Sequence, residues 1–512
     1  MEQKILPPIN DELGLEQGNK DPGELYVSYS SEHLLNAQAS GLGVSLPSVE
    51  SSSLSSKRMD VSSIGQADDV VLVSTDLFLL KHLLELSKSF CKKYHVILAP
   101  DKTKLVAFHS KKQKFTVDYQ LNTISLDIEG LPIEPTNSAE HVGILRSSSG
   151  NLPYVQARIS AHSRALFLVL PCGLAKKHNT NPSASLRIQS LYALPVLMSG
   201  VASVNLLQSE INILSRHFRK TLRLLMKLPE KTPDIAVYYL AGSLSFEGHL
   251  HIKQLSLFGM ISRLPDCPLH SFAIHALTTL PDSNKSFFVN IRKLCNQYNL
   301  ETPLSILENP PEKSSFKSLI TSKIVDYWNN MFRVEIKSLS LLQHFRIEFM
   351  SLVKPHPVWT TCENNPFEVN KAIIMATMMS GRYKTDYLSR HWNPENPLGL
   401  CMHCGNISRK TGTLFHYFVE CEHFQEMRER IYQAWETRLE DNSYVLNMFN
   451  QRKHTPKSFF CLLIDPSSDS EIIHGTQMQM FSFNPTFHLC RTFCYAIHRQ
   501  RIKLLSDVEI KQ

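Results

Sequence analysis

The sequence predicts an α+β protein with a mixed N-terminal part, a long helical part and a small metal-binding motif near the C-terminus. Short apolar runs bounded by turn residues recur between residues 64 and 145, which predicts strands. Apolar residues recur at three- and four-residue spacing over much of residues 153–395, which predicts helices. Between residues 401 and 421, three cysteines and a histidine stand at spacings typical of zinc ligands.

The bulk composition sets limits on the class of protein. With 512 residues, of which 43% are hydrophobic, the chain is long enough for more than one domain. Its net charge of +7 permits a nucleic-acid partner without requiring one. Eleven scattered cysteines and no secretory signal favour reduced thiols in the nucleus or cytoplasm. The most apolar stretch, 191–207, is too short and too mixed for a membrane span.

An acidic pair, Asp68 and Asp69, stands just before the apolar run 70–73. Two adjacent carboxylates are costly to bury without partners, so we expect them on a tight turn between strands, where a cation can neutralise them. Carboxylate oxygens of this kind hold magnesium ions in phosphoryl transfer. An ordinary acidic hairpin turn is the alternative interpretation. The Ser-rich stretch 45–63 before it is expected to be an exposed loop.

Further elements follow in order. A helix is predicted over 77–94, with an N-cap among Ser74, Thr75 and Asp76. Strands are expected at 96–98 and 105–108, on either side of a turn that contains Lys102, and another around 141–145.

A basic helix is predicted from about residue 206 to residue 228. Its apolar stripe is accompanied by cations at three- and four-residue spacing, namely Arg216, Arg219, Lys220, Arg223 and Lys227. Like charges at this spacing repel one another unless anions neutralise them. A nucleic-acid phosphate backbone would supply such anions. The alternative is a solvated basic face.

The metal motif is Cys-x2-Cys followed by His-x4-Cys. Its predicted ligands, Cys401, Cys404, His416 and Cys421, suit tetrahedral zinc. Such a site can contribute on the order of 10 kcal/mol to folding. For the fourth ligand, His423 could replace His416, and His403 could compete. Cys490, Cys494 and His498 recur at four-residue spacing, where a buried helix face is favoured over a second metal site.

Cations and aromatic residues interleave just before the metal motif. The cations are Arg382, Lys384 and Arg390, and the aromatic residues are Tyr383, Tyr387 and Trp392. Such a segment suits phosphate contact combined with base stacking.

Taken in order, these motifs resemble the reverse transcriptases of non-LTR (LINE-type) retrotransposons. The resemblance rests on the acidic turn, the helix after it, the Lys102 turn, the strand through Gly143 and the Cys-Cys-His-Cys knuckle. The segment 381–394 resembles the family's basic helix before that knuckle, and Glu16-Gln17-Gly18 resembles its Arg-Gln-Gly segment. The resemblance covers most of residues 12–430.

The resemblance implies RNA-directed DNA synthesis by two-metal nucleotidyl transfer, with an RNA template, a DNA primer and Mg²⁺. It implies that Asp68 and Asp69 are catalytic, with Asp68 a magnesium ligand. Gln17, Gly18 and Lys102 would contact the nucleotide and template. The family's other metal-binding Asp lies well upstream of the Gln-Gly segment, and nothing before Gln17 fits it. We therefore expect weak Mg²⁺ binding and no polymerisation by this chain alone.

The expected domains are a partial palm (1–145), a helical thumb (146–264), a helical connecting region (265–395), a zinc knuckle (396–430) and a helical tail (431–512). Three functions remain open: a polymerase completed by upstream sequence, a non-catalytic RNA- or DNA-binding remnant, and a decayed product without function. The oligomeric state is left open.

Overall fold

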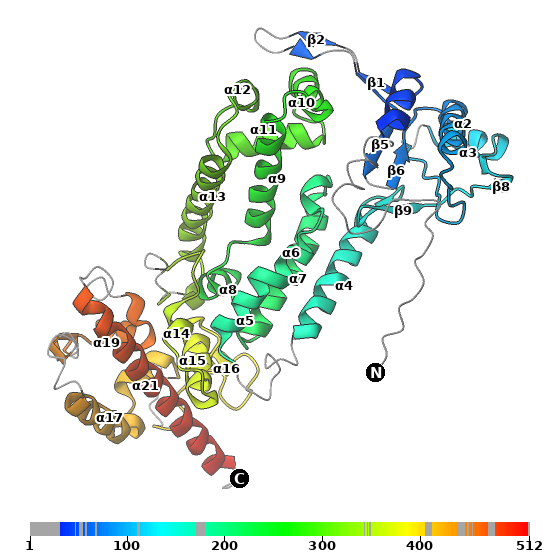
Figure 1. The fold of residues 1–512 in the computed structure, drawn as a ribbon. Helices are drawn as coiled ribbons and strands as arrows, with labels where there is room; N and C mark the ends of the chain where they lie inside the picture. The colour runs from blue at the N-terminus through cyan, green and yellow to red at the C-terminus, as the bar shows by residue number, and fades with distance from the viewer. Residues whose placement is uncertain are drawn as a thin grey trace, which may run out of the picture. The chain divides into compact units, whose positions relative to one another are not determined.

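In the computed structural model the chain forms two compact units, whose elements are drawn in Figure 1. The first comprises the described residues of 1–157, 203–206 and 255–316, and the second those of 158–202, 207–254 and 317–512. The structure describes residues 31–46, 48–50, 55–56, 59–66, 69–109, 113–169, 180–342, 344–345, 347, 350–404, 412–438, 446–447, 450–452, 454–468 and 477–509.

The strands of the first unit form separate two-stranded antiparallel sheets. The pairs are β1 (Val44–Leu46) with β4 (Met59–Val61), β2 (Val49–Glu50) with β3 (Ser55–Ser56), β5 (Ser63–Gln66) with β6 (Asp69–Leu72), β7 (Asp127–Ile128) with β8 (Leu131–Pro132), and β9 (Ser138–His141) with β10 (Ile144–Ser147). A two-stranded hairpin is marginal alone, so the helices packed on it supply stability. Short strands within a mostly helical chain agree with the α+β class.

Helix α2 (Leu77–Tyr94) has the bounds that the sequence predicts. The Asp76 carboxylate accepts hydrogen bonds from the backbone N–H groups of Phe78 and Leu79, at 2.7 and 3.3 Å, and so caps the helix. Leu77 and Leu84 pack with Leu126, Ile128 and Ile133 in the core of this part of the unit.

Several predicted elements of the first unit are wrong. Residues 96–98 and 105–108 form no strands, and Leu105 makes only an isolated bridge to Pro135. The segment predicted as one strand around 141–145 is instead divided between two strands: His141 ends β9 and Ile144 begins β10, with a turn of positive φ at Val142 and Gly143 between them. The expected loop 45–63 contains all or part of five short strands among its described residues. An apolar run becomes a strand only where a partner pairs with it, and no local pattern specifies the partner.

The remaining helices fill both units. They include α3 (Lys114–Thr123), α4 (Leu152–Val169), α5 (Pro182–Ile188), α6 (Leu194–Leu197), α7 (Gln208–Leu225), α8 (Asp234–Ala241), α9 (Phe246–Ser262), α10 (Pro268–Thr279), α11 (Phe287–Gln297), α12 (Pro303–Glu308) and α13 (Lys313–Ile336). The apolar spacing from 207 to 225 predicts a stripe of Leu207, Ile211, Leu214, Phe218, Leu222 and Leu225. Helix α7 buries the last four of these, whereas Ile211 is half-buried and Leu207 is exposed just before the helix. In the described residues, no helix is long and apolar enough to cross a membrane.

The C-terminal part of the second unit is built around α21 (Gln477–Glu509). This helix packs against α15 (Pro366–Met379) and α19 (Pro456–Ile464). On its buried face, the Cys490 and Cys494 thiols donate to the carbonyls of Leu462 and Leu463. The favoured interpretation of these two cysteines as a buried helix face is therefore confirmed.

Candidate metal centre

The four predicted ligands of the metal motif come together in the second unit. Cys401 and Cys404 lie at either end of a tight turn. His416 opens a π-helical segment, His416–Glu420, and Cys421 follows it. The Cys421 N–H donates to the His416 carbonyl at 2.8 Å, which closes a turn wider than that of an α-helix. This wider turn brings residues five apart to the same side, so His416 and Cys421 face one point.

The distances fit a tetrahedral metal ion. The Cys401 and Cys421 sulfurs lie 3.8 Å apart, and the Cys404 sulfur lies 3.4 Å from His416 Nε2. All four ligand atoms lie within 4.8 Å of one another. A zinc–sulfur bond of about 2.3 Å places two sulfurs of a tetrahedral site about 3.8 Å apart. A disulfide would need about 2.05 Å. These four residues could hold a metal ion such as zinc.

Local hydrogen bonds favour a thiolate at Cys401. The Cys421 thiol, the His416 ring and the backbone N–H groups of Cys404 and His403 contact its sulfur. Together these contacts outweigh burial and hold the pKa of Cys401 well below its usual value. The hydrogen bond that the Cys421 thiol donates to Cys401, together with burial, raises the pKa of Cys421. Cys401 and Cys421 are both buried. A cluster that stabilises thiolate where water is excluded is suited to a cation.

His416 is held from both sides of its ring. Burial lowers its pKa, but the Cys401 sulfur and the Glu420 carboxylate outweigh burial and raise the pKa overall. Its Nε2 faces Cys404, while Nδ1 lies 3.3 Å from Glu420 Oε2. The two ring nitrogens thus have different partners.

The other two histidines of the motif do not join the cluster. His423 is exposed, although its backbone N–H donates to the Cys421 sulfur. The His403 ring packs edge-on against Phe424, with ring centroids 5.8 Å apart. The structure therefore groups His416 with the three cysteines, which resolves the alternatives left open by the sequence.

Residues outside the predicted knuckle hold in place the turn from Cys401 to Cys404, here called the ligand turn. The Asp386 carboxylate accepts the Met402 N–H at 3.1 Å and an N–H of Arg501 at 2.8 Å. Asp386 opens the short helix α16 (Asp386–Ser389), and Arg501 lies on α21. The Arg428 guanidinium donates to the Cys421 carbonyl at 2.8 Å. The candidate centre is therefore packed into a larger helical body.

Gly412 marks a close approach of two backbone segments beside the centre. Its carbonyl accepts the Tyr387 N–H at 2.8 Å. A Cβ added at Gly412 would lie 2.3 Å from the Gly399 carbonyl oxygen. Only glycine fits here without a backbone shift, so this contact restricts the chain between the two ligand pairs.

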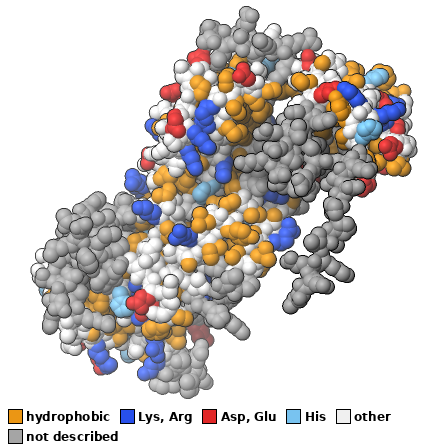
Figure 2. All heavy atoms as spheres, viewed as in Figure 1, with side chains coloured by type: hydrophobic (Ala, Val, Ile, Leu, Met, Phe, Trp, Pro, Cys, Tyr) orange, Lys and Arg blue, Asp and Glu red, His pale blue; other side chains and the backbone are white. Residues whose placement is uncertain are grey.

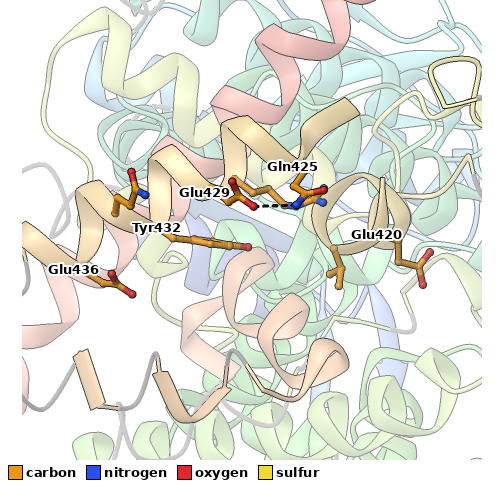
Figure 3. Close-up of a pocket in the computed structure, with 8 residues that line it drawn as sticks. Glu420, Gln425, Glu429, Tyr432 and Glu436 are labelled. Atoms are coloured by element: carbon orange, nitrogen blue, oxygen red, sulfur yellow. Dashed lines mark hydrogen bonds between the residues drawn. The ribbon is translucent and has the colours of Figure 1, made fainter. Parts of the chain in front are cut away.

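An open cleft of about 630 Å³ lies next to the centre. It is lined mainly by α17 (Gln425–Arg438), and Figure 3 shows Glu420 at one end of the row of side chains. Glu429 and Glu436 add two more carboxylates, and Glu429 accepts a hydrogen bond from Gln425 at 3.0 Å. Glu420 therefore belongs both to the cleft and to the surroundings of His416.

The residues expected at a polymerase site are only partly described. Gln17, Gly18 and Asp68 lie outside the described residues. Asp69 is exposed at the start of β6, opposite Gln66 of β5, and Lys102 is exposed in a turn. Among the described residues, the only group of three or more potential metal ligands is the Cys/His cluster. The described part of the chain gives no support to a magnesium site.

The basic face of α7 is only partly available to an external anion. Arg219 forms an ion pair with Asp234 at 2.9 Å, and Arg223 pairs with the same carboxylate. Burial lowers the pKa of Lys227, which lies half-buried just beyond the helix. Arg216 and Lys220 are exposed. Asp234 therefore neutralises two of the five cations within the chain.

The segment before the motif is a series of turns around the four-residue helix α16, so the expected basic helix is absent. Tyr383 is buried and bonds His498 Nδ1 at 2.9 Å. The Arg390 guanidinium lies 3.7 Å from the centre of the Tyr387 ring. Lys384 and Trp392 are exposed, and Arg382 is half-buried. On the face drawn in Figure 2, Lys and Arg side chains are scattered among hydrophobic ones.

Sequence reasoning missed the residues around the ligands. Glu420 stands four residues after His416, a spacing that could have indicated a carboxylate partner. Asp386, Arg428 and Arg501 gave no comparable signal, because their contacts span 7 to 115 residues of sequence.

No model of a known protein family matches the chain, and no curated protein is significantly similar to it.

Proposed function

We propose that this chain is a nucleic-acid-binding protein whose C-terminal body is organised by one structural zinc ion. The observation that carries the proposal is the convergence of Cys401, Cys404, His416 and Cys421 at tetrahedral spacing. Three sulfurs and one imidazole nitrogen form a donor set that suits zinc. Four protein ligands leave no open position for substrate, so the role of the ion is structural.

Nucleic acid is the partner that best fits the exposed groups of the second unit. Arg216 and Lys220 offer two cations one turn apart on α7. Near the candidate centre, Lys384 is exposed and the Trp392 side chain is 72% exposed. Cations attract phosphates, and an exposed indole ring offers a stacking surface to an unpaired base. The resemblance to reverse transcriptases supports the same class of partner.

A fluorescence-anisotropy titration with labelled RNA and single-stranded DNA tests this function. We expect binding that weakens steeply as salt rises, because counterions are released from the phosphates. Substituting Lys384→Gln and Trp392→Ala together should weaken binding. Lys323→Gln with Lys337→Gln is the control, because it removes two exposed charges from the same unit, one more than the test pair, and leaves the aromatic rings in place. Salt-independent binding, or equal loss in both pairs, would contradict the proposal.

A second candidate function is RNA-templated DNA synthesis. The β5–β6 hairpin favours it, because Asp69 lies at the end of a tight hairpin, where the family resemblance implies a catalytic carboxylate. Such synthesis would need a second carboxylate besides those of this hairpin, because two metal ions must be held. Magnesium-dependent primer extension that is lost in Asp68→Asn would favour the polymerase.

A further inference from the structure

Glu420 has a geometric relation to His416 that the set of four ligands does not explain. The carboxylate Oε2 lies 3.3 Å from His416 Nδ1, while the opposite ring nitrogen, Nε2, lies 3.4 Å from the Cys404 sulfur. Both residues belong to the same π-helical segment. We propose that Glu420 is a positioning residue that fixes the His416 ring for metal binding; this inference rests on the proposed zinc site.

The protonation of the imidazole ring determines which nitrogen can bind a metal ion. A neutral imidazole carries one N–H and one lone pair, and an ionised carboxylate can only accept a hydrogen bond. The contact with Glu420 therefore places the proton on Nδ1 and leaves the lone pair on Nε2. That lone pair points toward the three sulfurs. A carboxylate behind a ligating histidine also makes the ring a stronger donor to the metal.

The setting of Glu420 limits the size of its effect. The His416 side chain is 3% exposed, whereas that of Glu420 is 54% exposed and borders the open cleft. Water competes for an exposed carboxylate, so its contact with the ring is weaker than a buried one. Loss of such an outer partner commonly costs 10- to 100-fold in metal affinity, and we expect about tenfold here.

The cleft offers a matched control. Glu429 lines the same cleft, and its carboxylate bonds Gln425 rather than His416. Removing Glu429 changes the charge near the centre by the same amount as removing Glu420, without touching the ring. A difference between the two variants therefore reports positioning and not bulk electrostatics.

The test uses the full chain with zinc, in competition with a chromophoric chelator. Glu420→Ala should bind zinc about tenfold more weakly than wild type, and Glu429→Ala should bind it equally well. Glu420→Gln keeps an oxygen that can accept the Nδ1 proton, so it should recover part of the loss. With Co²⁺ in place of zinc, Glu420→Ala should alter the d–d bands while the sulfur charge-transfer bands persist.

The outcomes separate this inference from the function on which it rests. If wild type binds no zinc, the proposed structural zinc fails. If wild type binds zinc, but Glu420→Ala binds it as tightly and with an unchanged Co²⁺ spectrum, the positioning role is overturned. Should Glu420→Ala fold poorly, the comparison of Glu420→Leu with Glu429→Leu decides in the same way, because leucine keeps much of the side-chain bulk and accepts no hydrogen bond.

Discussion

Asp386 and Arg501 form a buried ion pair, with 2.8 Å between the Asp386 Oδ1 and Arg501 Nη2 atoms. The other carboxylate oxygen of Asp386 accepts the Met402 N–H, inside the turn that carries Cys401 and Cys404. One carboxylate therefore joins α21 to the candidate metal centre. The ligand turn and helix α21 should therefore stabilise each other.

Breaking this pair should destabilise the second unit. A buried charge left without its partner costs about 3–5 kcal/mol, so Asp386→Ala should lower the free energy of unfolding by an amount of that order. It should also weaken zinc binding, because the Met402 N–H loses its acceptor. Chemical denaturation followed by far-ultraviolet circular dichroism measures the change, with exposed Glu395→Ala as control. A cost below about 1 kcal/mol, typical of surface pairs, would contradict the coupling.

Removing the metal should loosen α21 as well as the ligand turns. We expect a chelator to speed amide hydrogen exchange at residues 401–404 and 412–421, and also along 486–501 of α21, because Arg501 reaches the ligand turn through Asp386. Helix α2, in the other unit, serves as the internal control. Faster exchange that is confined to the ligand turns would show that the centre and α21 are independent.

The exposed cations of α7 should contribute to RNA binding, whereas its ion-paired cations should contribute to stability. Arg216→Gln with Lys220→Gln should leave stability nearly unchanged, and should reduce the salt slope of single-stranded RNA binding by about 1.4. Arg219→Gln with Arg223→Gln should instead destabilise the fold, because Asp234 loses both partners. Denaturation and anisotropy titrations on both double variants check this. Similar effects of the two pairs on stability would contradict the division.

Acid should destabilise the second unit through His162. Burial, reinforced by His217, lowers the pKa of His162 from 6.5 to about 4. Between these values the unfolded chain binds a proton that the folded chain does not, so stability falls as the pH drops from 6.5 toward 4. The full shift corresponds to on the order of 3 kcal/mol.

The control for this effect is a variant that cannot titrate. His162→Gln should be less pH-sensitive than wild type across that window. Some sensitivity should remain, because burial also lowers the pKa of His249 and His251 to about 4. Denaturation midpoints measured at several pH values test the difference. Parallel pH profiles for the two proteins would exclude His162 as a contributor.

The sequence predicted the elements that depend on interactions between residues close together in the chain. Helix α2 follows from its apolar period and the Asp76 cap, and the buried stripe of α7 follows from its spacing. The Cys-x2-Cys and His-x4-Cys spacings identified the ligand group, because ligands close in sequence can reach one ion. The strand at 105–108 failed, because pairing depends on a partner that the segment itself does not encode.

The sequence alone did not show which charged side chains form ion pairs with residues far away in the chain. The pairing of Arg219 and Arg223 with Asp234 needs a turn that folds α8 back toward α7. The Asp386–Arg501 contact spans 115 residues and has no local signature. For the same reason, the segment 396–430 looked like a self-contained knuckle, although Asp386 and Arg501 hold its ligand turn.

Metal analysis of the purified full chain shows whether Cys401, Cys404, His416 and Cys421 hold a zinc ion. We expect one tightly bound zinc per chain. It should be lost in Cys401→Ser with Cys421→Ser, and retained in Cys490→Ser with Cys494→Ser, because the thiols of Cys490 and Cys494 lie on the buried face of α21. A folded wild-type chain that binds no zinc, or equal zinc in both double variants, would contradict it.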